Sequence, residues 1–270
     1  MRHVAARVAC MAVTLMFAAA FVTPTATADP GVRISSQSEQ ILQTLLAARS
    51  KASAAQPSDQ SEMLSRQFLG TPYGANTLVG SATVPEQLVV ELQKVDCFTY
   101  ADYVEALKRA GERDQFIASL INVRYKDGVV SFQNRKHFFT DWAATSPAVA
   151  TDITASLSAK AAQSNKNLNR KDSGDLYLPG LPVVPRAVSY IPSQQVDSGV
   201  VGRLRTGDYI GAYAQNGGLD VTHVGMFIDA PNGPVLRNAS SLSANDKVVD
   251  SPLADYLKTV PGIVVLRPVR

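Results

Sequence analysis

The chain has 270 residues, with 26 basic and 23 acidic side chains and a formal net charge of +3. The basic residues form no stripe, so the sequence lacks the usual charge signature of nucleic-acid binding. A length of about 240 residues after removal of an N-terminal signal segment is sufficient for one sizeable core and is most simply one domain.

The first 28 residues predict a secretory signal peptide. Arg2 and Arg7 precede an apolar run at 8–22, and Ala26-Thr27-Ala28 matches a small-x-small cleavage site. The apolar run is too short for a membrane anchor, and no later stretch reaches spanning length. We therefore expect cleavage after Ala28, export across the inner membrane to the periplasm or the exterior, and no stable membrane span afterwards.

Removal of this segment would leave Cys97 as the one remaining cysteine, because Cys10 lies within the apolar run. A secreted protein with one cysteine forms no internal disulfide. Its thiol is either a buried structural group or a chemically active one, and composition alone favours neither interpretation.

Helical patterns dominate the N-terminal half. Residues 29–60 predict a leader containing one helix, and 61–74 predict a helix that Gly70 and Pro72 end. Residues 85–95 alternate like a strand but also fit a helix. From Asp96, a good N-cap, the pattern is helical to about Arg109, and a further helix is expected at 115–123.

Strand patterns dominate the C-terminal half. The Asp-Gly pair at 127–128 predicts a short hairpin, whereas 158–185 is polar and predicts an exposed connection or a helical excursion. Strands bounded by turn residues are then expected at 188–192, 207–214, 222–229, 233–240 and 262–269. This order predicts a single α+β domain at 61–270, with helices packed on an antiparallel sheet.

Cys97 lies at the first turn of a predicted helix, where backbone amides and the helix dipole lower the pKa of a thiol. Asp96 has the opposite effect, so the helix alone does not suffice and a neighbouring histidine is needed as a base. After residue 28 the chain contains two histidines, His137 and His223. The search for a base is therefore short.

His223 is the preferred base. It shares a strand face with Val221 and Gly225, opposite the more apolar face of the same strand. Asn238 follows in the next predicted strand, where an amide oxygen can orient the imidazole, and Ser240 is a weaker alternative. The other interpretation of His223 is an ordinary hydrogen-bonded strand histidine. His137 fits a substrate contact or a structural hydrogen bond better than a base.

Other chemistries lack their motifs. One cysteine and two widely spaced histidines do not form a metal cluster, and the sequence has neither a Gly-rich phosphate loop nor a G-x-S-x-G elbow. We therefore expect no metal and no cofactor.

Several stretches carry a family resemblance and occur in family order over most of the chain: "FLGTPYG" (68–74), "VDCFTYADYVEAL" (95–107), "RYKDG" (124–128), "RKHFFTDW" (135–142), "YIP" (190–192), "GDYIGAYAQNGGLDVTHVGMFI" (207–228) and "NASS" (238–241). With them, the chain resembles the N-acetylmuramoyl-L-alanine amidase-like family of the NlpC-type papain-like cysteine peptidase superfamily. The resemblance implies a helix bearing the cysteine on an antiparallel sheet bearing the histidine. It also implies peptidoglycan or muropeptides as the substrate.

The resemblance further implies that Tyr73 lines the site and that Asp96 contacts the substrate. The remaining candidates for oxyanion or substrate contacts are His137, Trp142, Asp220 and Ser240. One departure concerns the third catalytic position, which is frequently histidine in this family and is Asn238 in this chain.

The implied activity is cysteine-dependent hydrolysis of an amide bond in the bacterial cell wall. The bond is either the link between the lactyl group of N-acetylmuramic acid and L-alanine or, in an endopeptidase, a bond within the stem peptide. Acyl transfer through the same thioester and a wall-binding protein without catalysis are the alternatives.

Overall fold

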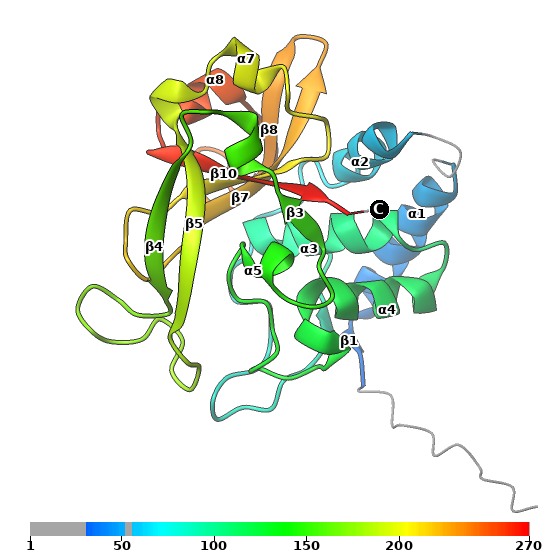
Figure 1. The fold of residues 1–270 in the computed structure, drawn as a ribbon. Coiled ribbons are helices and arrows are strands. Elements are labelled where there is room, and N and C mark those ends of the chain that lie inside the picture. Colours follow the sequence, from blue (N-terminus) through cyan, green and yellow to red (C-terminus); the bar gives the residue numbers. More distant parts are fainter. Residues whose placement is uncertain (1–30, 52–55, 270) are drawn as a thin grey trace, which may run out of the picture.

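The computed structural model describes residues 31–51 and 56–269. The predicted signal peptide at 1–28 lies outside the described residues. Figure 1 shows helices α1, α2, α3 and α4 gathered on one side of the molecule and a large sheet on the other. No helix in the described part of the chain is long and apolar enough to cross a membrane.

The four helices are α1 (Ser36–Lys51), α2 (Pro57–Arg66), α3 (Cys97–Lys108) and α4 (Arg113–Arg124). All four were expected from the sequence, and the start of the helix after Asp96 is confirmed to the residue. The second helix begins and ends earlier than expected, because a series of turns occupies the residues before Gly70.

The large sheet has eight strands, with seven in the order β4-β5-β10-β6-β7-β8-β9 and β3 paired with β10. Their bounds are β3 (Ala150–Asp152), β4 (Ala162–Leu168), β5 (Val184–Pro192), β6 (Tyr209–Tyr213), β7 (Val221–Ala230), β8 (Gly233–Ser240), β9 (Lys247–Pro252) and β10 (Gly262–Pro268). Every pairing within it is antiparallel, so the mixed α+β class with helices on an antiparallel sheet is confirmed.

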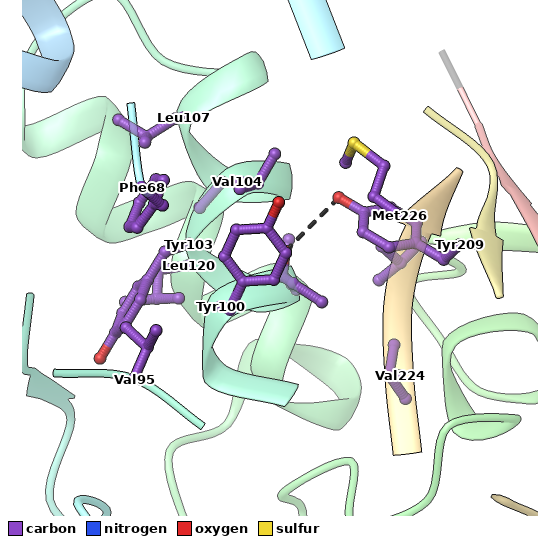
Figure 2. Packing of buried hydrophobic residues seen from close by; sticks show 14 of the residues in the cluster. Phe68, Val95, Tyr100, Tyr103, Val104, Leu107, Leu120, Tyr209, Val224 and Met226 are labelled. Carbon is purple, nitrogen blue, oxygen red and sulfur yellow. Dashed lines mark hydrogen bonds between the residues drawn. The ribbon is translucent and has the colours of Figure 1, made fainter. Parts of the chain in front are cut away.

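Apolar side chains cover the sheet on both faces. On one face, Phe68, Tyr100 and Val104 pack with Val224 and Met226 of β7, as Figure 2 shows. On the other face, a second cluster of residues from β6, β7, β8 and β10 packs with the short helices α6 (Thr154–Leu157), α7 (Ser198–Val201) and α8 (Leu253–Leu257). The central strands therefore lie between two layers, which holds β7 rigidly in place.

The prediction of a hairpin around Asp127 and Gly128 is wrong. The turn exists, because both residues have positive φ, 55° and 66°. However, it forms the short helix η1 (Lys126–Gly128) directly after α4, and the residues that follow do not form a strand. A local Asp-Gly signal marks a left-handed turn but does not show what the turn connects.

The expectation for 158–185 also needs correction, because this segment contains β4, which pairs along its whole length with β5. Its sequence, AQSNKNL, is largely polar because β4 is an edge strand. β9 was missed for the same reason, since it too lies at an edge of the sheet. Of residues 85–95, only β2 (Val89–Val90) is a strand, paired in parallel with β1 (Arg33–Ile34).

Candidate active site

Cys97 is the first residue of α3, and Asp96 caps the helix as the sequence predicted. The Asp96 carboxylate accepts hydrogen bonds from the amides of Phe98 (3.0 Å) and Thr99 (2.7 Å), and the Thr99 hydroxyl accepts one from the Asp96 amide (3.0 Å). This reciprocal capping box fixes the direction in which the helix begins. The cap does not use the amide of Cys97, which is left to serve a ligand beside the sulfur.

The thiol of Cys97 is a weak acid in this setting. Burial, and then the negative charge of Asp96, raise the pKa of Cys97 to about 12, while the backbone amides of Val224, Cys97 and Phe98 lower it. The raising effects are larger, because desolvation penalises the thiolate more than three amides stabilise it. Cys97 is therefore a neutral thiol in the unliganded protein.

The sulfur lies where β7 and β8 separate. These strands pair from Ala230–Gly233 to Met226–Arg237, and the ladder stops there although both strands continue. Beyond that point the Val224 amide of β7 faces the Cys97 sulfur. The first turn of α3 therefore meets the sheet at the place where two neighbouring strands no longer bond to each other.

His223 and Asn238 meet at this same place. His223 Nε2 and Asn238 Oδ1 are 3.0 Å apart. The orientation of the asparagine is fixed, because its Nδ2 donates to the Leu236 carbonyl oxygen (3.0 Å) and to Ser251 Oγ of β9 (3.1 Å). Its oxygen must then accept from His223, so the proton is on Nε2 and the imidazole has Nδ1 free as an acceptor.

The imidazole is neutral at rest. Burial lowers the pKa of His223, and its hydrogen bond to Asn238 and the charge of Asp96 offset only part of this effect. No hydrogen bond joins His223 to Cys97 among the residues that the structure describes, a separation that is common before a substrate binds. The strand face that carries His223 is partly covered by the protein, because Phe227 on the same face packs in the second apolar cluster.

Tyr73 forms a parallel bridge with Val95, two residues before the thiol of Cys97. The Tyr73 amide donates to the carbonyl oxygen of Asp246 (2.9 Å), and the Val95 amide donates to that of Pro72 (3.0 Å). The first bond fastens Tyr73 to the loop before β9, and the second fastens Pro72 to the residues that precede Cys97. Burial, and then the negative charge that Cys97 would carry as a thiolate, raise the pKa of Tyr73, so its hydroxyl stays protonated and can donate a hydrogen bond.

Two predicted substrate contacts have almost no exposed surface, which argues against direct contact. Trp142 is 0% exposed and packs against Tyr209 with the ring planes nearly perpendicular. Asp220 is 2% exposed and accepts hydrogen bonds from the Thr140 amide (2.7 Å) and hydroxyl (2.8 Å). Both side chains are held in contacts inside the protein, although the indole Nε1 of Trp142 is buried without a hydrogen-bond partner among the described residues.

His137 and Ser240 stay predictions with no direct support. His137 Nε2 lies 2.7 Å from the carbonyl oxygen of Phe132, and burial lowers the pKa of this histidine to about 4. Ser240 is 5% exposed, and its hydroxyl accepts from the Leu242 amide (3.3 Å) rather than orienting His223. Of Asn238 and Ser240, Asn238 is the one that hydrogen-bonds to His223.

Two contributors could not be found from the sequence. Ser251 of β9 fixes the orientation of Asn238, and Tyr256 of α8 lies with its ring centroid 6.3 Å from that of His223. Neither residue stands in a recognisable motif, because each reaches the site through an element that forms only when the sheet assembles. Within the described ranges, no three His, Cys, Asp or Glu side chains form a cluster that could hold a metal ion.

A family model described as N-acetylmuramoyl-L-alanine amidase-like (AmiA-like) matches residues 63–263. The chain belongs to this family. The matched range begins before Tyr73 and ends after Tyr256, so it contains the whole site described above. No curated protein matches the chain.

Solved structures resemble most of the chain. A Legionella pneumophila protein with the family model DUF1460 is 24% identical and has a TM-score of 0.72 over 86% of this chain and 95% of its own, which shows the shared fold. An N-acetylmuramoyl-L-alanine amidase from Bacteroides uniformis is 28% identical, with a TM-score of 0.68 over 79% of this chain and 99% of its own. A putative xylanase from Bacteroides fragilis is 27% identical, with a TM-score of 0.61 over 75% of this chain and 98% of its own.

Proposed function

We propose that this protein is a secreted cell-wall hydrolase that cleaves the amide between N-acetylmuramic acid and L-alanine in peptidoglycan or muropeptides. Cys97 is the nucleophile, His223 the base and Asn238 the residue that orients the base. The observation that carries the proposal is the His223–Asn238 hydrogen bond of 3.0 Å, held next to a thiol at a helix start. The arrangement fits a papain-like fold of the NlpC type.

The proposed reaction begins with a neutral pair. As the Cys97 sulfur attacks the amide carbonyl, Nδ1 of His223 takes the thiol proton, and the Cys97 amide stabilises the oxyanion with Tyr73 nearby. The tetrahedral intermediate then breaks its C–N bond, His223 gives its proton to the leaving amine, and a thioester remains. Water, deprotonated by His223, attacks the thioester, and the acid and the thiol are released.

Asn238 makes this sequence possible by keeping the imidazole in one tautomer. Because the asparagine oxygen accepts from Nε2, the proton must enter and leave through Nδ1. The imidazolium that forms during acylation is stabilised by the same oxygen and by the charge of Asp96, which acts to raise the pKa of His223. The role of Asp96 is therefore twofold: it opposes a resting thiolate and favours the protonated base.

The name of the Bacteroides fragilis neighbour suggests glycoside cleavage, which the site supports less well. Glycosidases use a pair of carboxyl groups, one as acid and one as nucleophile or base. The carboxylate nearest Cys97 in sequence, Asp96, is committed to the cap of α3. A thiol, an imidazole and an amide oxygen fit acyl chemistry instead.

The test is digestion of purified muropeptides, followed by mass spectrometry of the products. Release of the sugar together with an intact stem peptide would establish the amidase, whereas a shortened stem still attached to the sugar would show an endopeptidase. Added amine acceptors separate acyl transfer from hydrolysis.

Cys97→Ala is the matched variant, because it removes only the sulfur. We expect it to fold and to lose all turnover. Full turnover by the folded variant would remove the nucleophile assignment. Binding of cell wall without any product from the wild-type protein would leave a wall-binding protein.

A further inference from the structure

Tyr256 contacts the site from the second layer of the sheet. It lies on α8, whose residues pack in the cluster on the face opposite α3. Its ring centroid is 6.3 Å from that of His223, with an angle of 46° between the planes. The same short segment supplies Ser251, which holds Asn238. One stretch of chain therefore touches two of the three proposed catalytic groups.

The hydroxyl of Tyr256 makes no hydrogen bond within the part of the chain that the structure describes, although its ring is half-buried. A phenol in such surroundings ordinarily finds a partner. Burial, and then the negative charge that Cys97 would carry as a thiolate, raise the pKa of Tyr256, so its hydroxyl keeps its proton. The result is a protonated donor without a protein partner beside His223.

Tyr73 and Tyr256 reach the site from different segments. Tyr73 forms a parallel bridge with Val95, so it lies toward the start of α3. Tyr256 instead contacts His223. In amide hydrolysis the base must deliver its proton to the leaving amine, so the leaving group lies on the His223 side.

We infer that Tyr256 contacts the substrate, with its ring covering His223 and its hydroxyl donating a hydrogen bond to a carbonyl oxygen of the departing stem peptide. This inference rests on the proposed function. The ring keeps water away from the imidazole, and the hydroxyl holds the leaving peptide where its nitrogen can take the proton from Nδ1. Tyr256 keeps its proton throughout, so this contact makes and breaks no covalent bond.

The experiment compares Tyr256→Phe and Tyr256→Ala with the wild type and with Tyr177→Phe, a control at another half-buried tyrosine. Two measurements are made on each protein: kcat and KM on a defined muropeptide, and the rate at which iodoacetamide alkylates Cys97 across a range of pH. Muropeptide turnover requires departure of the stem peptide, whereas alkylation involves no stem peptide.

Tyr256→Phe should lower kcat/KM about 5- to 30-fold, the loss typical of one hydrogen bond to substrate, and leave alkylation of Cys97 unchanged. Tyr256→Ala should lower turnover further and also alter the pH dependence of alkylation, because water then reaches His223. Tyr177→Phe should match the wild type in both measurements.

Equal turnover by Tyr256→Phe and an active wild type would overturn the inference and leave the proposed function intact. A parallel loss of alkylation and turnover in Tyr256→Phe would also overturn it, because the hydroxyl would then act on the thiol. If the folded wild type cleaves no muropeptide, the proposed function fails and the inference fails with it.

Discussion

Replacing Asp96 by asparagine should make the Cys97 thiol more reactive while α3 stays capped. Asparagine is as good an N-cap as aspartate, and its amide oxygen can accept from the same two amides, Phe98 and Thr99. The substitution removes the negative charge, which is the second cause of the raised pKa after burial. The thiolate should therefore form more readily.

The size of the effect follows from the acidity of the thiol. A rise in the pKa of Cys97 from 9.0 to about 12 reduces the thiolate fraction at neutral pH about 1,000-fold. A more basic thiolate is a better nucleophile, and this offsets roughly 20-fold of the loss in reaction rate. Wild-type Cys97 should thus react about 50-fold more slowly than a free cysteine, and each unit of lowered pKa in Asp96→Asn should accelerate alkylation about threefold.

The assay is alkylation by iodoacetamide, followed by mass spectrometry of the intact protein from about pH 6 to about pH 10. Asp197→Asn is the matched control, because Asp197 caps α7 by accepting from the Val200 amide (2.9 Å). The wild-type rate should rise steadily with pH over this range without a plateau. Asp96→Asn should follow the same slope at higher rates, and Asp197→Asn should match the wild type.

Two results would refute this reasoning. A plateau of rapid alkylation at neutral pH, lost in His223→Ala, would mean that Cys97 and His223 rest as a thiolate–imidazolium pair. Identical rates for Asp96→Asn and the wild type would instead show that the charge of Asp96 does not reach the sulfur.

Two further predictions concern the side chains around the site. Asn238→Leu should lower muropeptide turnover about 10- to 100-fold without abolishing it, because His223 Nε2 loses its acceptor; full activity in a folded variant would remove Asn238 from the mechanism. Burial lowers the pKa of His137 from 6.5, its value in the unfolded chain, to about 4 in the folded protein. Because the unfolded chain binds this proton more readily, a fall from pH 7 to pH 5 should destabilise the fold by about 2 kcal/mol. Urea titrations of His137→Gln, whose amide can still donate to Phe132, should show correspondingly less acid destabilisation, and equal acid sensitivity would contradict the pKa.

The sequence by itself was sufficient for the parts of the site that depend on local rules. An aspartate before a helical pattern predicted the cap and placed Cys97 at the first turn, since capping involves neighbours in sequence. Alternation along residues 222–229 and 233–240 predicted two strands, and their antiparallel pairing made Asn238 a reasonable partner for His223. The family motifs indicated Tyr73.

The tertiary structure alone decided which side chains are available to a substrate. Trp142 and Asp220 stand in motif-like stretches, yet Trp142 is buried in the apolar cluster that includes α3, and Asp220 is buried against Thr140. Polar edge strands such as β9 show no periodic signal, because solvent faces them and no apolar rhythm is required. Ser251 and Tyr256 reach the site through that strand and the helix after it, and contacts of this kind depend on how distant segments pack rather than on any local pattern.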